Sequence, residues 1–142
     1  MVDANITDPT LGELRRIDDF SHGRSVIVSG REVQLVIDTG EGLTPEALAQ
    51  ARNVVGAPEH FSQRARQLAS ESLHELKNET WSGDDSPLTA SQLAERLSLE
   101  ACEIAADGLA TLYFDDGGLF GGHSVVVYVD ANGDFVDAKL AG

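Results

Sequence analysis

The segment LFGGHSVVVYVD, residues 119–130, places a glycine pair and a histidine directly before an apolar, strand-like run. A histidine in glycine-rich backbone can act as a general base or line a small pocket. The residues that would form such a pocket are Phe120, Gly121, Gly122, His123 and Ser124. Their spacing matches neither a P-loop, which needs a lysine, nor a GxGxxG turn before a helix. The first interpretation is therefore structural, with glycines easing the chain into a crowded strand, and the second is a pocket.

Other reactive side chains are spread along the chain without motif spacing. They are a single cysteine, Cys102, and three further histidines, His22, His60 and His74. Cys102 alternates with Ile104 and is expected on the apolar face of a strand, as a small core residue. No catalytic residue and no cofactor is predicted from these positions.

Two acidic motifs resemble the beginning of a metal site. DANGD, residues 130–134, has the D-x-N-x-D start of a calcium loop, but Phe135 replaces the glycine at position six and Ala141 the glutamate at position twelve. A hairpin turn of type I′ at Asn132-Gly133 is the favoured interpretation. In DDGG, residues 115–118, the two adjacent carboxylates are interpreted as solvated. No metal ligand is predicted.

The charge of the chain restricts its partners. Its 142 residues include 10 basic and 24 acidic side chains, for a formal net charge of -14. Such a chain repels nucleic acids and anionic membranes, and attracts a basic protein partner. One cysteine, no apolar leader and no uncharged apolar run near 18 residues indicate a cytoplasmic protein.

One stripe of carboxylates contradicts two local rules. Glu71, Glu75 and Glu79 recur every fourth residue of a helix predicted from residue 58 to 79, so they share one face and repel each other. They also lie toward the helix C-terminus, where the macrodipole favours cations. We expect such a stripe to bind a partner, with Trp81 as an anchor. The competing interpretation is that carboxylates align by chance in so acidic a chain, with nearby basic side chains relieving the repulsion.

These residues must be positioned by a chain whose hydrophobic period changes from two to about 3.6 and back to two. A short strand is predicted near residues 11–17, followed by a hairpin whose Gly30-Arg31 turn pairs Val28 with Val33 and Val26 with Leu35. Three helices follow. The first runs from the Thr44 cap to Gly56, the second covers residues 58–79, and a short third begins at the capping box formed by Thr89 and Gln92.

Strands return after residue 97. A three-residue loop, 106–108, pairs Ile104 with Ala110, and the Asn132-Gly133 turn pairs Val125 with Leu140 and Val129 with Val136. Strands at both ends with helices between them predict a single α+β domain over residues 1–142. Its antiparallel sheet has six or seven strands, in the order of three strands, three helices and four strands, and the helices pack on one face.

The chain also resembles a known family. DPTLGEL near the start, a tryptophan after a long helix, LTASQLAERLSL, and the stretch from LFGGHSVVVYVD to AKLAG are similar to an uncharacterised family of small bacterial proteins, a domain of unknown function. The likeness covers nearly the whole chain, and its most specific part is residues 120–124. The resemblance implies that His123 is a family position without an assigned role. By analogy, small acidic bacterial proteins of this kind include immunity and accessory proteins.

The charge and the glutamate stripe together predict a non-enzymatic interaction protein, of immunity type, that docks on a basic surface of another protein. The alternative is a small hydrolase or ligand-binding domain with its pocket at the Gly121 to His123 end of the sheet. A packed and hydrogen-bonded His123 favours the first function. A carboxylate, serine or cysteine beside it in an open cleft favours the second.

Overall fold

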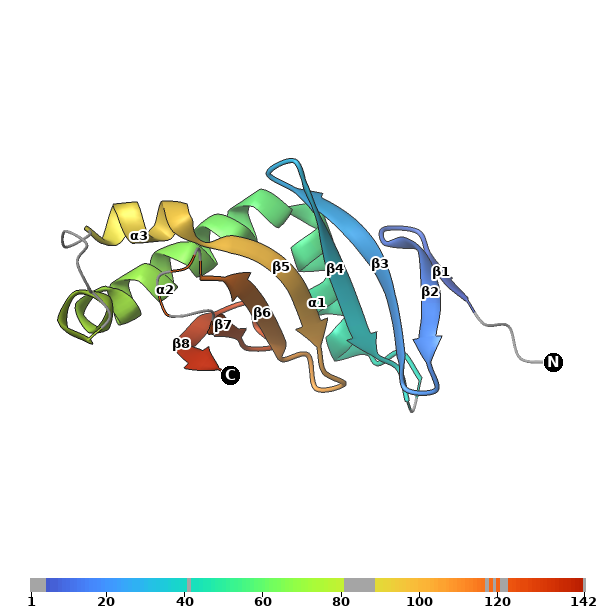
Figure 1. Cartoon of the computed structure of the whole chain (residues 1–142). Helices are drawn as coiled ribbons and strands as arrows, with labels where there is room; N and C mark the ends of the chain where they lie inside the picture. Colours follow the sequence, from blue (N-terminus) through green and yellow to red (C-terminus); the bar gives the residue numbers. More distant parts are fainter. Residues whose placement is uncertain are drawn as a thin grey trace.

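A computed structural model of the chain describes residues 5–40, 42–80, 89–116, 118, 120 and 123–141, without the side chains of 75–80 and 141. The first four elements are strands, namely β1 (Ile6–Asp8), β2 (Gly12–Asp18), β3 (Ser21–Val28) and β4 (Arg31–Asp38). Three helices follow, α1 (Pro45–Gly56), α2 (Pro58–Thr80) and α3 (Ala90–Arg96). The chain ends with β5 (Ser98–Ile104), β6 (Ala110–Asp115), β7 (Ser124–Val129) and β8 (Phe135–Ala141). The predicted α+β class and the three helices are confirmed (Figure 1).

The strands form one mixed sheet of eight in the order β1 to β8. The predicted antiparallel sheet of six or seven strands is wrong in two respects. The first is the number of strands, because β1 has only three residues and is too short to show a hydrophobic period. The second is the pairing of β4 with β5, which is parallel from Gln34 opposite Ala101 to Ile37 opposite Ile104. The helical segment between these strands is a crossover connection, which returns the chain to enter the sheet in the same direction.

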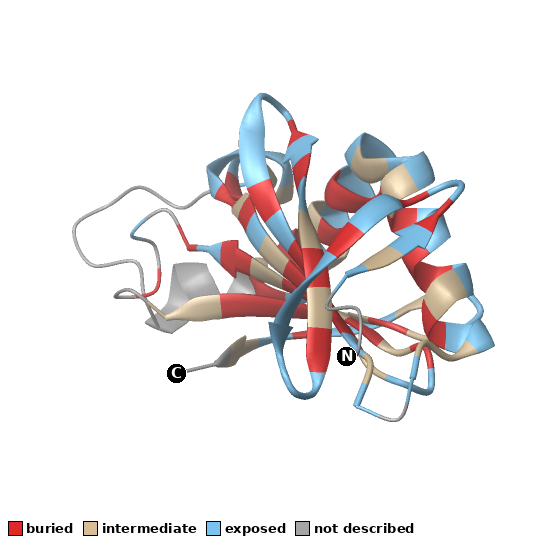
Figure 2. Ribbon diagram, turned by 90° about the vertical axis from the view of Figure 1, so that its right-hand side faces the viewer, coloured by how far each residue is buried: buried red, intermediate tan, exposed pale blue. Residues whose placement is uncertain are grey.

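Helices α1 and α2 lie against one face of the sheet, and α3 packs on α2. Figure 1 shows β4 and β5 in front of α1, with the helix-free face of the sheet toward the viewer. Buried and exposed residues alternate along the strands (Figure 2), as the period of two predicts. The strand residues buried toward the helices include Val26, Val33, Leu35, Ile37, Cys102, Ile104, Leu112, Phe114, Val125 and Val127.

The helix starts follow the predicted capping signals. The Thr44 hydroxyl accepts the N–H of Ala47 at 3.1 Å, and α1 ends at Gly56. At α3, Thr89 and Gln92 form both bonds of the capping box. The Gln92 N–H donates to the Thr89 hydroxyl at 3.1 Å, and the Thr89 N–H donates to the side-chain oxygen of Gln92 at 2.9 Å. Each cap satisfies backbone donors that the first turn leaves unpaired, so these helix starts are set locally.

The β3–β4 hairpin turns at Ser29-Gly30, so the predicted Gly30-Arg31 turn is wrong. Ser29 and Gly30 have φ values of 52° and 77°, which fit a type I′ turn, and Val28 pairs with Arg31. The predicted register is displaced by two residues, which leaves every side chain on the same face. The apolar pattern is therefore identical in both registers. The observed turn is held by Glu59 of α2, whose carboxylate accepts the N–H and, at 2.7 Å, the hydroxyl of Ser29.

The β5–β6 hairpin has the predicted register, with Ile104 opposite Ala110 and Cys102 opposite Leu112. Its loop closes with the Gly108 N–H donating to the carbonyl of Ala105 at 2.9 Å. Gly108 has a φ of 90°, and a Cβ there would lie 2.9 Å from the Cβ of Ala131 in the next hairpin loop. Glycine is therefore required both by the conformation and by the close approach of the two loops.

In the β7–β8 hairpin, the predicted pair of Val125 and Leu140 is confirmed. The predicted pair of Val129 and Val136 is wrong, because a bulge places Phe135 opposite Val129. Phe135 then packs against Phe61 of α2, with ring centroids 5.5 Å apart and the rings tilted by 45°, whereas Val136 is 55% exposed.

The loop of that hairpin also departs from the predicted type I′ turn. Gly133 has a φ of 86°, but Asn132 does not have a positive φ. The Gly133 N–H donates to the carbonyl of Asp130 at 2.9 Å, as in a type I turn that ends in a glycine bulge. The Asp130 carboxylate accepts the N–H groups of Asn132 and Asp134, both at 3.0 Å, so DANGD is a hairpin loop as expected.

Asp8 links the β1–β2 turn to α1. Its buried carboxylate lies 2.8 Å from a guanidinium nitrogen of Arg52 and accepts the N–H groups of Thr10 and Leu11 at 2.9 and 3.0 Å. The hydrogen bond from Arg52, followed by that from the Leu11 N–H, lowers the pKa of Asp8 below its usual value.

We therefore expect Asp8→Asn to destabilise the fold at neutral pH. The folded-state pKa lies below the unfolded one, so this stabilisation is present above about pH 4 and is lost as the pH falls through the folded-state pKa. Urea unfolding from pH 7 to pH 3 should show the wild type and Asp8→Asn converging at low pH. Asp19→Asn removes an exposed partner of Arg16 and should have the smaller effect at pH 7. Parallel stability curves for wild type and Asp8→Asn would contradict this.

Candidate functional site

A groove of about 400 Å³ opens where the β2–β3 turn approaches β4, β5 and β6. Three carboxylates line it, from Asp18, Asp38 and Glu103, together with the apolar side chains of Phe20 and Val36. The other lining residues are Ser21, Ile104, Ala105, Leu109 and Thr111, so the lining contains acidic, neutral and apolar groups but no basic one.

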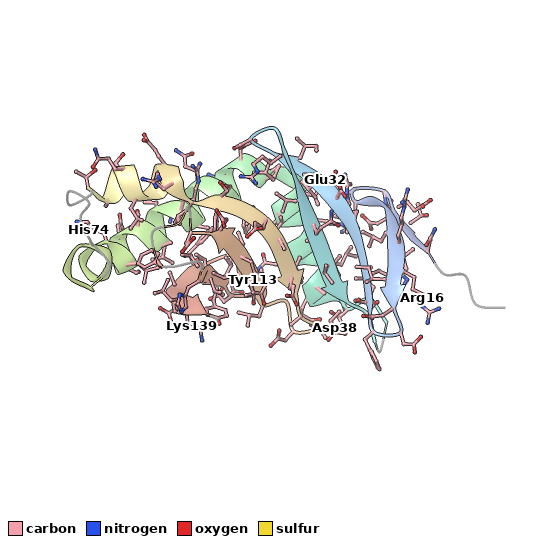
Figure 3. The ribbon with its side chains drawn as sticks, viewed as in Figure 1. Arg16, Glu32, Asp38, His74, Tyr113 and Lys139 are labelled. Carbon is pink, nitrogen blue, oxygen red and sulfur yellow. The ribbon has the colours of Figure 1, made fainter. Side chains whose placement is uncertain are left out.

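Strand pairing brings the groove residues together. Val36 and Asp38 are two residues apart on β4 and share a face of the sheet. Glu103 is opposite Val36 in the parallel pairing of β4 with β5, and Thr111 is opposite Glu103 in the antiparallel pairing of β5 with β6. This face is opposite the one that buries Ile37 and Ile104 against the helices. The groove therefore lies on the helix-free face, and Asp38 is at the end of β4 (Figure 3).

The β2–β3 turn forms the apolar edge of the groove. The Asp18 carboxylate accepts the N–H of Phe20 at 2.8 Å and the hydroxyl of Ser21 at 2.9 Å. These two bonds, the first being the larger cause, lower the pKa of Asp18, so its charge persists at neutral pH. The same turn leaves Phe20 70% exposed beside that charge. The groove therefore combines an exposed aromatic ring with carboxylates.

On its β6 side the groove is continued by Tyr113. Burial, and then the hydrogen bond and charge of Glu103, raise the pKa of Tyr113 above its usual value, so the hydroxyl stays protonated and donates to Glu103. Further along the sheet, the ammonium group of Lys139 lies 5.3 Å from the ring centre of Tyr128. Figure 3 shows Tyr113 and Lys139 on β6 and β8. The sheet surface is thus acidic at the groove and carries a basic side chain, Lys139, at β8.

The predicted helix stripe is a separate surface. Glu71 is exposed on α2, accepts a hydrogen bond from Gln67 at 3.3 Å, and lines a concavity between α2 and α3. The side chains of Glu75 and Glu79, and all of Trp81, lie outside the described residues. The groove residues were not predicted, because the parallel β4–β5 pairing that brings Glu103 to β4 leaves no local signal in the sequence.

Asp116 anchors the loop before β7. Its carboxylate is 2% exposed and accepts the N–H groups of Gly118 at 2.8 Å and Phe120 at 2.9 Å, and Phe120 is fully buried. The expectation that both carboxylates of DDGG are solvated is therefore wrong for Asp116. Buried backbone donors require acceptors, and the Asp116 side chain supplies them here.

His123 is half-buried, and its Nδ1 lies 2.6 Å from the carbonyl oxygen of Phe120. A carbonyl only accepts, so Nδ1 carries the proton. Ser124 is half-buried at the start of β7, whereas Gly121 and Gly122 lie outside the described residues. The contact described for the His123 ring therefore ties it to the backbone of its own loop.

The remaining reactive side chains lie on several different elements. Cys102 is buried under the helices as expected for a core residue, and burial raises its pKa to about 12, so the thiol is protonated at neutral pH. His22 contacts the Thr39 hydroxyl at 2.6 Å. His60 and His74 are 14 residues apart on α2, about 21 Å along the helix axis, so they cannot act together.

These features define the class of this protein as an α+β protein with an acidic groove on the helix-free face of an eight-stranded mixed sheet. The chain belongs to the family described as uncharacterized protein conserved in bacteria (DUF2262), whose family model matches residues 8–140. The resemblance inferred from its sequence motifs is thus confirmed. Comparison with curated proteins and with solved structures found no match. Of the described helices, none has an apolar stretch long enough to cross a lipid bilayer.

Proposed function

We propose that this protein is a non-enzymatic interaction protein, of immunity type, that docks on a basic surface of a partner protein. The observation that supports this function is the groove on the helix-free sheet face, where the carboxylates of Asp18, Asp38 and Glu103 line a concavity with the exposed ring of Phe20 and no basic residue. Lysine or arginine side chains of a partner would complement both its charge and its apolar floor.

Association would take place in two stages. The net charge of -14 attracts a basic partner over distances of a Debye length and raises the association rate. Contact then buries Phe20, which is 70% exposed, and Val36 beside it. Burying a large aromatic side chain at the centre of an interface is the usual source of slow dissociation. Charge would therefore set mainly the association rate, and Phe20 the dissociation rate.

The hydrogen bond from the His123 Nδ1–H to the carbonyl of Phe120 supports a structural role for this ring. A small hydrolase or ligand-binding domain with its pocket at the Gly121 to His123 end of the sheet stays the alternative function. The glutamate stripe on α2 stays a prediction as a second docking surface, with Glu71 exposed as that prediction requires.

Binding of a basic probe tests the groove. We would measure fluorescence anisotropy of a labelled ten-residue lysine-rich peptide with the wild type, with Asp38→Asn/Glu103→Gln, and with the matched control Glu32→Gln/Glu100→Gln. Both double variants have the same net charge. We expect the groove variant to bind about fivefold more weakly, because two charge pairs worth about 0.5 kcal/mol each are lost. The control should change affinity less than about twofold.

Two outcomes would reject the groove as the docking surface. Equal weakening by both double variants would mean that only net charge matters. A larger loss in Glu71→Gln/Glu75→Gln/Glu79→Gln than in the groove variant would assign docking to α2. Phe20→Ala should weaken binding even at high salt, because apolar contacts are not screened.

A further inference from the structure

A second concavity, of about 160 Å³, lies where the β3–β4 turn meets α2 and the junction between α3 and β5. These segments lie along the upper edge of the view in Figure 1. Two arginines, Arg31 and Arg66, line the concavity with the serines Ser29, Ser62 and Ser98. This lining is rich in hydrogen-bond donors, in contrast to the acidic groove.

The Nε–H group of Arg66 has no hydrogen-bond partner although it is buried. Among the described residues, no other buried side-chain nitrogen or oxygen lacks a partner. A buried N–H donor without an acceptor is unfavourable, and an ordered water or ion is one of the ways in which native proteins satisfy such a group. The Arg66 side chain therefore has hydrogen-bonding capacity that no described protein group uses.

Neither arginine of the concavity forms an ion pair with a described residue, which is unexpected in so acidic a chain. In the part of the chain that the structure describes, the arginines with a carboxylate within 4.0 Å are Arg15, Arg16 and Arg52. Carboxylates exceed basic side chains by 14 in the chain, yet no carboxylate of the described residues lies within that distance of these two arginines.

Two carboxylates are near the concavity. Both carboxylate oxygens of Glu59 accept hydrogen bonds from Ser29, one from its N–H and one from its hydroxyl. These bonds, and more weakly the charge of Arg66, lower the pKa of Glu59. Glu95 lines the wall of the concavity but is not within 4.0 Å of either guanidinium. Both acids moderate the positive potential, and neither occupies the donors.

We propose that this concavity is an oxyanion site that takes a phosphate group, either as free phosphate or as the phosphate of a small metabolite. Arg66 would donate from the terminal nitrogens of its guanidinium group, and Arg31 from the turn that lines the same concavity. Two guanidinium charges match a dianionic phosphate, whose several oxygens also accept from the hydroxyls of Ser62 and Ser98. The phosphate site is independent of the proposed docking function, because it lies on a different surface and binds a ligand of opposite charge.

The test is isothermal titration calorimetry of the full chain with sodium phosphate, with sodium chloride of equal ionic strength as the blank. We expect saturable phosphate binding that weakens at least about tenfold in Arg31→Gln and in Arg66→Gln, since each loses a charge-assisted hydrogen bond. Arg15→Gln is the matched control, because Arg15 is exposed at β2 and pairs loosely with Glu13 at 4.0 Å. It should leave the affinity within twofold.

The site is overturned if phosphate gives no saturable heat beyond the chloride blank, or if Arg15→Gln weakens binding as much as the other variants. Arg31 is exposed at a turn, so Arg31→Gln keeps the test decisive if Arg66→Gln fails to fold. A parallel titration with glycerol phosphate separates the sources. Tighter binding of the ester than of inorganic phosphate supports a metabolite site, and the reverse order supports a site for free phosphate.

Discussion

Phe114→Ala is expected to lower the free energy of unfolding by about 3–5 kcal/mol. Phe114 is fully buried on β6, where it is paired with Leu99 of β5 and Val125 of β7 beneath the helical layer. Truncation removes the transfer free energy of the ring and leaves a cavity, because a site enclosed by strands on both sides cannot collapse. Urea denaturation at pH 7 measures the change.

Phe20→Ala is the matched control for this prediction. It removes the same ring from a position that is 70% exposed, so the free energy of unfolding should change by less than about 0.5 kcal/mol. Similar losses in the two variants would show that Phe20 is buried in the folded protein, and would also remove it from the proposed docking surface.

Gly23→Ala is expected to destabilise the fold by about 1–3 kcal/mol or more. A Cβ at Gly23 would lie 2.3 Å from the carbonyl oxygen of Leu35 and 2.8 Å from a methyl carbon of Ile17. The Ile17 side chain can rotate away, but the carbonyl belongs to β4, which pairs with β3 along its whole length. Relieving the contact therefore requires the two strands to separate. Thermal and urea unfolding measure the loss.

Gly56→Ala is the control for the effect of the added methyl group. A Cβ at Gly56 meets no atom within 4 Å, and the residue ends α1 without a positive φ. Alanine is the better helix former, so this variant should be unchanged or more stable by up to about 1 kcal/mol. Unaltered stability of Gly23→Ala would mean that β3 and β4 are farther apart at this point.

The two proposed surfaces lie at opposite ends of β4. Arg31 begins this strand and Asp38 ends it, seven residues or about 23 Å away. Variants at one end should leave binding at the other end unchanged. Arg31→Gln should therefore retain the affinity for the lysine-rich peptide, and Asp38→Asn the affinity for phosphate.

Local signals in the sequence determined the element types. Capping residues such as Thr44 and Thr89 act within one helical turn, and the change of hydrophobic period separates strands from helices. The loop of residues 106–108 fixes the β5–β6 register through its own length and Gly108, so that register was predicted correctly. The family was also evident from motifs along the chain.

The register of the first hairpin was decided by tertiary structure. A two-residue displacement keeps each side chain on its face, so hydrophobic pattern cannot distinguish Ser29-Gly30 from Gly30-Arg31 as the turn. Glu59, 30 residues away on α2, contacts Ser29 in the observed register. The parallel pairing of β4 with β5 has the same origin, because it depends on how three helices return the chain to the sheet.

Both candidate sites also exist only in the tertiary structure. The acidic groove needs the strand pairing that places Glu103 beside β4. The burial of Asp116, which is not a lining residue of either site, likewise needs backbone donors that face its carboxylate. The oxyanion concavity needs Arg31 from a turn and Arg66 from a helix to line one surface, although they are far apart in the sequence. The sequence determines the type and charge of each residue, whereas contacts between distant segments determine whether a charged side chain has a partner.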